Sequence, residues 1–313
     1  MPPMNTAQAR AVDPILTNHA RGYVQPNFVG NALFPRISVP KRGFKVIKFG
    51  TEGFMLYNTA RAPGADRKRV TFGYGTEAVT LKQDSLEAVV PFEYLEETSD
   101  LPSVDLASQA VNVPLRSIAL GLEYRQAAVA QDANNYGASN KIAIAAAGDK
   151  WSADTSTPGS DVNTAKQAVA DQIAMEPNTM VIGQKAYYAL KENAALKNHF
   201  KYTSGDAITL DMLARYFEVD RLEVGRARYW DADAGKMMPV WGNHAILSYT
   251  PPEAERAAAM PAYGYTYGLQ GYPNVRVPYD EDRNDSWFYP TTDETSVELV
   301  GATAGYLIQN VVD

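Results

Sequence analysis

The feature that most constrains the fold is a long stretch of β-type alternation broken by a turn-rich tip. Apolar and polar residues alternate with period two in residues 44–49 and again in residues 70–74, as in strands with one buried face. Residues 58–66, between the two runs, are rich in turn-forming residues. Two strands joined by such a tip predict a hairpin that protrudes from the body. Shorter runs at residues 78–81 and 88–90 extend the β pattern towards Leu95.

Charge is separated along this stretch. The tip carries Arg61, Arg67, Lys68 and Arg69 against Asp66, whereas residues 84–105 contain seven acidic residues and no Lys or Arg. The acidic residues are Asp84, Glu87, Glu93, Glu96, Glu97, Asp100 and Asp105. A stiff hairpin of roughly ten residues per strand holds its tip about 30 Å from its base. Within one chain the basic tip and the acidic segment therefore cannot readily meet, although both could simply be solvated faces.

The N-terminus is basic and poor in helix-forming sequence. Residues 1–50 hold seven basic residues, including Arg10 and Arg21, and one acidic residue, Asp13, which gives a net charge of +6. Several Pro and Asn residues interrupt any long helix before residue 28. These properties predict an extended arm with at most a short helix near residues 6–11. Residues 1–30 are expected to become ordered only against a partner.

The middle of the chain changes from one long helix to alternating helices and strands. Residues 114–132 carry an apolar stripe at helical spacing, and helix could extend back to Asp105. After a polar loop at residues 152–160, short strands and amphipathic helices alternate up to about residue 249. The C-terminal part returns to β patterns. There Tyr263, Tyr265 and Tyr267 alternate with small residues, so a strand would carry rings on one face and almost nothing on the other.

Composition excludes several classes of site. The chain of 313 residues has no Cys and only three His, and its net charge is −7. Thiolate metal sites, disulfides and Cys nucleophiles are therefore excluded, as is a general basic coat for nucleic acid. No nucleotide-binding, zinc-protease or serine-hydrolase motif is present. We predict no catalytic residues, no cofactor and no metal. A hydrolase using paired carboxylates remains an alternative, because such pairing is spatial rather than local.

The order of these elements resembles the major capsid proteins of tailed double-stranded DNA phages, of the Hong Kong 97 type. Residues 177–193 resemble the strand, turn and helix of that family's axial domain, and residues 240–251 resemble the strand that follows. Residues 61–64 resemble the tip of its hairpin, residues 264–268 a later strand, and residues 305–308 its closing strand. Together these segments cover most of residues 28–313.

The resemblance implies an α+β fold with five parts. These would be an N-terminal arm (residues 1–35), a β-rich segment (36–104) with an extended loop at about 45–98, a peripheral domain (105–159) with a spine helix at 105–133, an axial domain (160–275), and return strands of the peripheral domain (276–313). The extended loop would lie over a neighbouring subunit. The candidate interface residues are then Arg61, Arg67, Lys68, Arg69, Glu93, Glu96, Glu97 and Asp100, with Arg10 and Arg21 of the arm.

The resemblance also implies a function and partners. The chain would assemble with itself, as hexamers and pentamers, into an icosahedral shell enclosing phage double-stranded DNA, without sequence specificity and without a membrane. A separate scaffold protein, a portal and a decoration protein would be further partners. The protein would be part of the virion and be assembled in the host cytoplasm. Encapsulin compartments share this fold and are the alternative within it.

Overall fold

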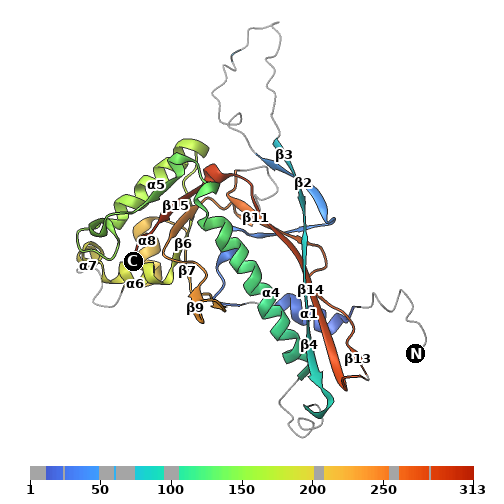
Figure 1. Ribbon diagram of the computed structural model, residues 1–313. Coiled ribbons are helices and arrows are strands. Elements are labelled where there is room, and N and C mark those ends of the chain that lie inside the picture. Colours follow the sequence, from blue (N-terminus) through green and yellow to red (C-terminus); the bar gives the residue numbers. More distant parts are fainter. Residues whose placement is uncertain are drawn as a thin grey trace.

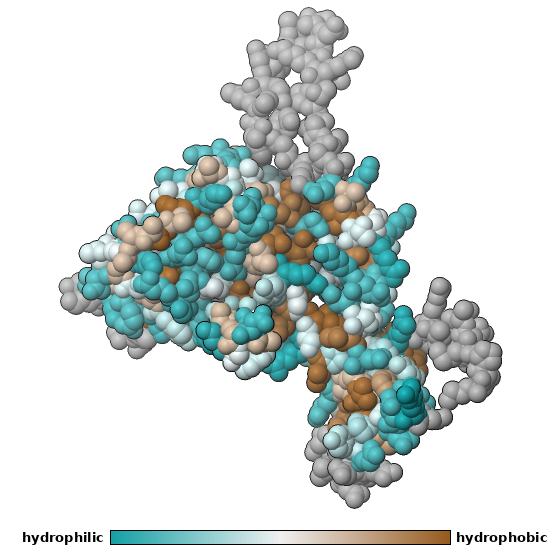
Figure 2. Space-filling view, viewed as in Figure 1, coloured by the Kyte–Doolittle hydropathy of each residue, from teal (hydrophilic) through white to brown (hydrophobic). Residues whose placement is uncertain are grey.

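A computed structural model describes residues 12–48 except 24, residue 60, and residues 75–94, 106–200, 208–253 and 261–313 except 282. Figure 1 shows a long sheet with one long helix along it, joined to a second body in which helices surround a shorter sheet. Figure 2 shows hydrophobic residues gathered where these two parts meet and along the long sheet. Within the described parts of the chain, no helix combines the length and apolar character needed to cross a bilayer.

The long sheet is organised around strand β14 (Ser286–Leu299). One edge of β14 pairs antiparallel with β4 (Lys82–Pro91) along ten residues. Its other edge pairs with β13 (Tyr279–Glu281), β12 (Asn274–Val275) and β11 (Gly264–Leu269), and β1 (Arg36–Val39) adds to β11 in parallel. Along its 14 residues β14 thus pairs with four other strands.

Helix α4 (Leu106–Gln131) covers one face of this sheet. It confirms the long helix expected at residues 105–133. Pro114 lies inside the helix, and the next residue, Leu115, is buried in a cluster with Val90 of β4 and Tyr289 of β14. At 1.5 Å per residue its 26 residues give a rod of about 39 Å, which spans the long sheet.

A separate hairpin base rises from one end of the long sheet. Strands β2 (Gly43–Lys48) and β3 (Gly75–Thr80) pair antiparallel with each other and, among the described strands, with no other. Val46 and Val79 are buried against Tyr265, and the ring of Phe44 lies 4.8 Å from that of Tyr267. This confirms the first predicted strand and its place in a hairpin; the predicted second strand (residues 70–74) and the tip (residues 61–69) lie outside the described residues. The expected loop limit near residue 98 is corrected, because β4 belongs to the long sheet.

The second body is built on a five-stranded sheet in the order β5-β15-β10-β6-β7. Its strands are β5 (Lys141–Ala143), β6 (Thr179–Gly183), β7 (Arg221–Gly225), β10 (Ala245–Ser248) and β15 (Gly305–Gln309). Helices α5 (Pro158–Ile173), α6 (Gln184–Glu192), α7 (Ala194–Phe200) and α8 (Leu210–Phe217) surround it. The sheet and its helices share one hydrophobic core, in which the side chains of Trp151, Phe217 and Trp241 are almost completely buried. Thr209 caps α8 by accepting a bond from Met212 N.

Strand pairing assigns four strands differently from the sequence-based prediction. The closing strand β15 was placed with the return strands of the peripheral domain, but it pairs with β10 and β5 in the five-stranded sheet. Strand β5 was placed with the spine helix and lies in the same sheet. Conversely, β11 and β12 were placed in the axial domain and pair with β14. A strand's periodicity shows which residues face the core, but it does not show which sheet the strand joins.

Part of the predicted N-terminal arm belongs to the folded body. The predicted short helix at residues 6–11 lies outside the described residues, and a helix the sequence analysis missed, α1 (Pro14–Gly22), follows them. The Asp13 carboxylate caps it by accepting bonds from Ile15 N and Leu16 N. After the short helix α2 (Gly30–Leu33), Phe34 is fully buried in the main core. The arm boundary at residue 35 is therefore wrong, because residues 29–35 are part of the folded body.

Candidate subunit interfaces

Two opposed carboxylates lie at the middle of the long sheet. Asp84 of β4 and Asp293 of β14 are direct cross-strand partners. Arg36 of β1 grips Asp293 with two bonds of 2.8 and 3.0 Å, and Arg125 of α4 grips Asp84 with bonds of 2.6 and 3.1 Å. Like charges directly opposite on a sheet repel each other, so each needs its own arginine. The two ion pairs connect β1, β4, β14 and α4.

A third pair lies beside the hairpin base. Arg42, just before β2, donates to both carboxylate oxygens of Glu294 at 2.6 and 2.7 Å. This hydrogen-bonded cation lowers the pKa of Glu294. Arg36 and Arg42 thus neutralise carboxylates of their own chain, and the excess positive charge of residues 1–50 is not all available to a partner.

A buried carboxylate joins the spine helix to both other parts of the body. Glu123 of α4 accepts bonds from Val29 N at 2.8 Å, Gly30 N at 2.9 Å and Trp241 Nε1 at 2.6 Å. Burial raises the pKa of Glu123, and the three donors oppose that effect. One turn later, Gln126 Nε2 donates to Thr266 Oγ1 at 2.8 Å. The N-terminal segment, the long sheet and the second body therefore meet on one face of α4.

Only two of the candidate interface residues lie in described parts of the chain. Glu93 is exposed just after the end of β4, and Arg21 is exposed on α1, where it donates to Gly271 O of the same chain at 2.6 Å. Arg10, Arg61, Arg67, Lys68, Arg69, Glu96, Glu97 and Asp100 lie outside the described residues. Lys82, at the other end of β4, follows β3 after one residue. The ten residues of β4 therefore separate the hairpin base from Glu93, and at about 3.3 Å per residue this distance is about 30 Å.

Part of the acidic segment is already used within the chain. Asp84 is paired with Arg125, and the Glu87 carboxylate accepts a bond from the Tyr279 hydroxyl at 3.2 Å. The acidic residues that remain candidates for a neighbouring copy therefore begin at Glu93.

A second exposed hairpin was not predicted from the sequence. Strands β8 (Arg228–Asp231) and β9 (Lys236–Pro239) pair with each other, and Trp230 and Met237 face each other across them. Both side chains are more than half exposed. The short run of large residues followed by the turn-forming residues 231–235 is a hairpin signal that could have revealed it.

Comparison with known proteins settles what kind of chain this is. It matches the sequence model of the family described as phage major capsid protein E over residues 127–291. It is also 35% identical, over 97% of its length and 98% of the relative's, to the major capsid protein of Burkholderia phage BcepMu. The chain belongs to the phage major capsid protein family. As a capsid protein it is a structural component of a phage shell, and this membership favours the phage head over the encapsulin alternative and over the hydrolase.

Solved structures support the fold of this capsid protein. A phage-related protein from Bordetella bronchiseptica is 39% identical, with a TM-score of 0.84 over 97% of this chain and 99% of that one. The capsid protein of cyanophage P-SCSP1u has a TM-score of 0.54 at 12% identity, over 92% of this chain and 90% of that one. The α+β capsid fold of the Hong Kong 97 type, expected from the order of elements, is thus confirmed.

Proposed function

We propose that copies of this capsid protein form an icosahedral head shell in which the β2–β3 hairpin of each subunit lies over its neighbour. One observation supports this above all: β2 and β3 pair only with each other among the described strands, yet their base is fixed by a small apolar cluster on the long sheet. The segment between them, residues 49–74, is far longer than a hairpin turn requires. A fixed base with a long extension suits a contact with another copy.

The charges of the tip supply the register of that contact. Arg61, Arg67, Lys68 and Arg69 would meet the acidic residues Glu93, Glu96, Glu97 and Asp100 of the next copy. Glu93 lies at the end of the long sheet opposite the hairpin base, which makes a contact within one chain unfavourable. Each exposed pair contributes only about 0.2–1 kcal/mol. Repetition around every capsomer makes their sum significant, and salt should weaken it.

The first test reverses the tip charges. The double variant Arg67→Glu/Arg69→Glu should fail to form shells at low salt, and a matching change, Glu96→Lys or Glu97→Lys, should partly restore them. Assembly is measured by sedimentation and negative-stain electron microscopy of purified protein. Normal shells from the double variant would show that the tip charges do not set the register.

The remaining partners follow from the same proposal. Double-stranded DNA would fill the shell without sequence specificity, and Arg10 in the basic N-terminal segment is the candidate contact to its phosphates. A separate scaffold protein, a portal and a decoration protein would complete the head, which would assemble in the host cytoplasm. The proposal assigns the capsid protein no cofactor. If the purified protein stayed monomeric at every concentration and salt tried, with or without a scaffold, the proposal would be wrong.

A further inference from the structure

An exposed surface of large side chains runs from helix α6 onto the β8–β9 hairpin. Tyr188 of α6 is 55% exposed, and its hydroxyl accepts a bond from Gln184 Nε2 at 3.0 Å. Gln184 Oε1 in turn accepts from Arg228 Nη2 at 3.2 Å. Arg228 and Trp230 lie on one face of β8, and Trp230 faces Met237 on β9. We call the surface formed by Tyr188, Arg228, Trp230 and Met237 the aromatic edge.

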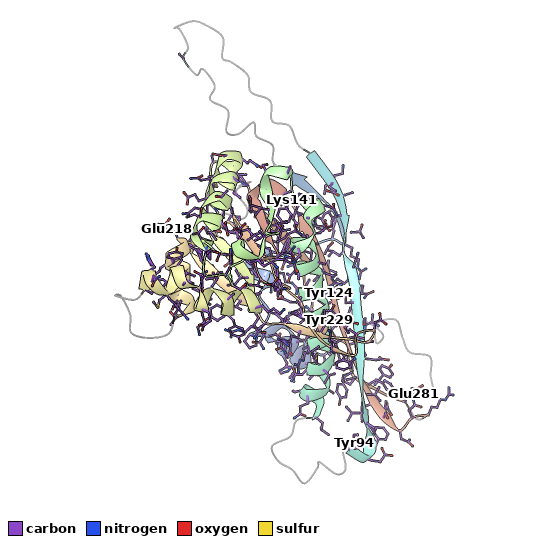
Figure 3. All side chains as sticks on the ribbon, turned by 60° about the vertical axis from the view of Figure 1, so that its left-hand side comes forward. Tyr94, Tyr124, Lys141, Glu218, Tyr229 and Glu281 are labelled. Carbon is purple, nitrogen blue, oxygen red and sulfur yellow. The ribbon has the colours of Figure 1, made fainter. Side chains whose placement is uncertain are left out.

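The β8–β9 hairpin, which carries most of this surface, packs against helix α4. The ring of Tyr229 lies 5.2 Å from that of Tyr124 on α4, nearly edge-on at 77°, and Figure 3 shows the two residues together. At the hairpin tip the Asp231 carboxylate accepts bonds from Asp233 N and Ala234 N. A surface that is already fixed loses little conformational freedom when a partner binds.

The composition of the aromatic edge is that of a protein interface. Trp, Tyr, Arg and Met are the residue types most enriched where proteins bind each other. Trp230 is 61% exposed and Met237 56% exposed. Such adjacent large apolar groups in contact with water are typical of a surface that a partner covers.

A second exposed surface, with complementary properties, lies at the edge of the five-stranded sheet opposite β7, the strand that leads into β8. Strand β5 is the outermost strand there, four strand spacings or about 19 Å from β7, and among the described strands it pairs only with β15. In Figure 3, Lys141, the first residue of β5, lies well away from Tyr229 in the hairpin. Ile142 is 46% exposed, and the exposed residues that follow are small, ending at the exposed carboxylate of Asp149. We call this surface the alanine edge; its residues are Ile142, Ala143, Ala145, Ala146, Ala147 and Asp149.

We propose that the aromatic edge of one subunit binds the alanine edge of the next copy around a capsomer, an inference that rests on the proposed function. A closed ring of identical subunits needs two different surfaces that complement each other. Small side chains on the alanine edge leave room for Trp230 and Met237. Arg228 supplies a cation, and Asp149 supplies the carboxylate that it can grip with two bonds. The β8–β9 hairpin follows edge strand β7, and the alanine edge begins on the other edge strand, β5, so the five-stranded sheet separates the two surfaces in every subunit.

Engineered cysteines test the contact directly, because the chain has no Cys of its own. Assembled Met237→Cys/Ala146→Cys protein should form disulfides between copies on oxidation. A denaturing gel should then show a ladder that ends at five and six linked chains. Each single-cysteine variant should remain monomeric on the gel, because the two edges are different surfaces. The same experiment is repeated with Met237→Cys combined in turn with Ala145→Cys, Ala146→Cys and Ala147→Cys. If all three double variants formed shells but gave only monomers on the gel, the proposal would be overturned.

A charge exchange tests the pairing of Arg228 with Asp149. Arg228→Asp and Asp149→Arg should each raise the protein concentration needed for assembly about tenfold or more, which corresponds to about 1.4 kcal/mol. The double variant should return it to within about threefold of wild type. Arg215→Glu, a charge reversal at an exposed position on α8, is the control and should assemble normally.

The outcomes separate this inference from the proposed function. Wild-type protein that never assembles would overturn the proposed function, and this inference with it. Wild-type shells together with unaffected Arg228→Asp and Asp149→Arg variants would overturn only the edge contact. If Arg228→Asp and Asp149→Arg each blocked assembly and the double variant did not recover it, the Arg228–Asp149 pairing would be overturned. A failure of the Arg215→Glu control to assemble would also overturn the pairing, because any charge reversal would then have the same effect.

Discussion

The ion pair between Arg36 and Asp293 gives a stability prediction whose size can be worked from the structure. We predict that Arg36→Met lowers the free energy of unfolding of the subunit by about 2–4 kcal/mol. Removing one partner of a buried pair generally costs about 3–5 kcal/mol, because the other charge stays buried without compensation. The Asp293 side chain is only 8% exposed, whereas that of Arg36 is 31% exposed, which places the cost towards the lower end.

The neighbouring carboxylate adds to this cost. Asp84 lies directly across the strands from Asp293, so without Arg36 the two negative charges share only Arg125. The single variant Arg36→Met therefore creates both an unpaired charge and an unscreened repulsion. Replacing Asp293 with the uncharged, nearly isosteric Asn removes both, so Arg36→Met/Asp293→Asn should recover at least about 1 kcal/mol relative to Arg36→Met.

Urea unfolding of the unassembled subunit, followed by the fluorescence of its four Trp residues, measures these differences. Arg215→Met is the matched control at an exposed position and should change stability by less than about 0.5 kcal/mol. If Arg36→Met cost less than about 1 kcal/mol, or if adding Asp293→Asn recovered nothing, the reasoning about a buried, mutually repelling pair would be refuted.

Three further predictions concern the buried carboxyl of Glu123, the N-terminal segment and two glycines. Burial raises the pKa of Glu123 in the folded chain, so this carboxyl stabilises the fold most at pH values below its unfolded pKa, and that stabilisation is lost as pH rises through its folded pKa. The difference in melting temperature between wild type and Glu123→Gln should therefore fall from pH 4 to pH 7. A difference that rose with pH would contradict this prediction. Deleting residues 1–11 should leave the circular dichroism spectrum of the subunit unchanged, whereas deleting residues 1–35 removes the fully buried Leu33 and Phe34 and should abolish folding; a folded product of the longer deletion would show that this segment is dispensable. Gly264→Ala would place a methyl group 2.6 Å from the Phe34 ring and should destabilise the folded subunit by about 1–3 kcal/mol. Gly121→Ala has open space around the new methyl group and should stabilise α4 by about 0.5–1 kcal/mol. Thermal unfolding in which Gly264→Ala was the more stable variant would contradict the close packing of Gly264 against Phe34.

Local patterns in the sequence were enough to predict the elements whose causes are local. The apolar stripe after residue 114 predicted the long helix, and the alternation at residues 44–49 predicted the first strand of the hairpin base, although its described partner is residues 75–80 rather than the predicted residues 70–74. The order of these elements was also sufficient to indicate the capsid family. In each case the residues that determine the structure are neighbours in the chain.

The candidate interface was predicted less well, because charge in a sequence does not show where the charge is used. Arg36, Arg42, Asp84 and Glu87 contributed to the predicted basic and acidic segments, yet all four bind partners within their own chain. The aromatic edge was missed altogether. Its members come from α6, β8 and β9, and only folding places Tyr188 beside Arg228.

The alternation of Tyr and small residues at 263–268 shows the division between sequence and tertiary structure. The sequence by itself determined a strand with rings on one face and almost no side chains on the other. Only the tertiary structure decided what fills the bare face: a Cβ on Gly264 would meet the Phe34 ring, and one on Gly268 would meet the Arg36 guanidinium. Phe34 comes from the segment that the sequence presented as an arm, and Arg36 directly follows that segment. Their positions depend on contacts between residues more than 220 apart in the chain, and no local periodicity records such contacts.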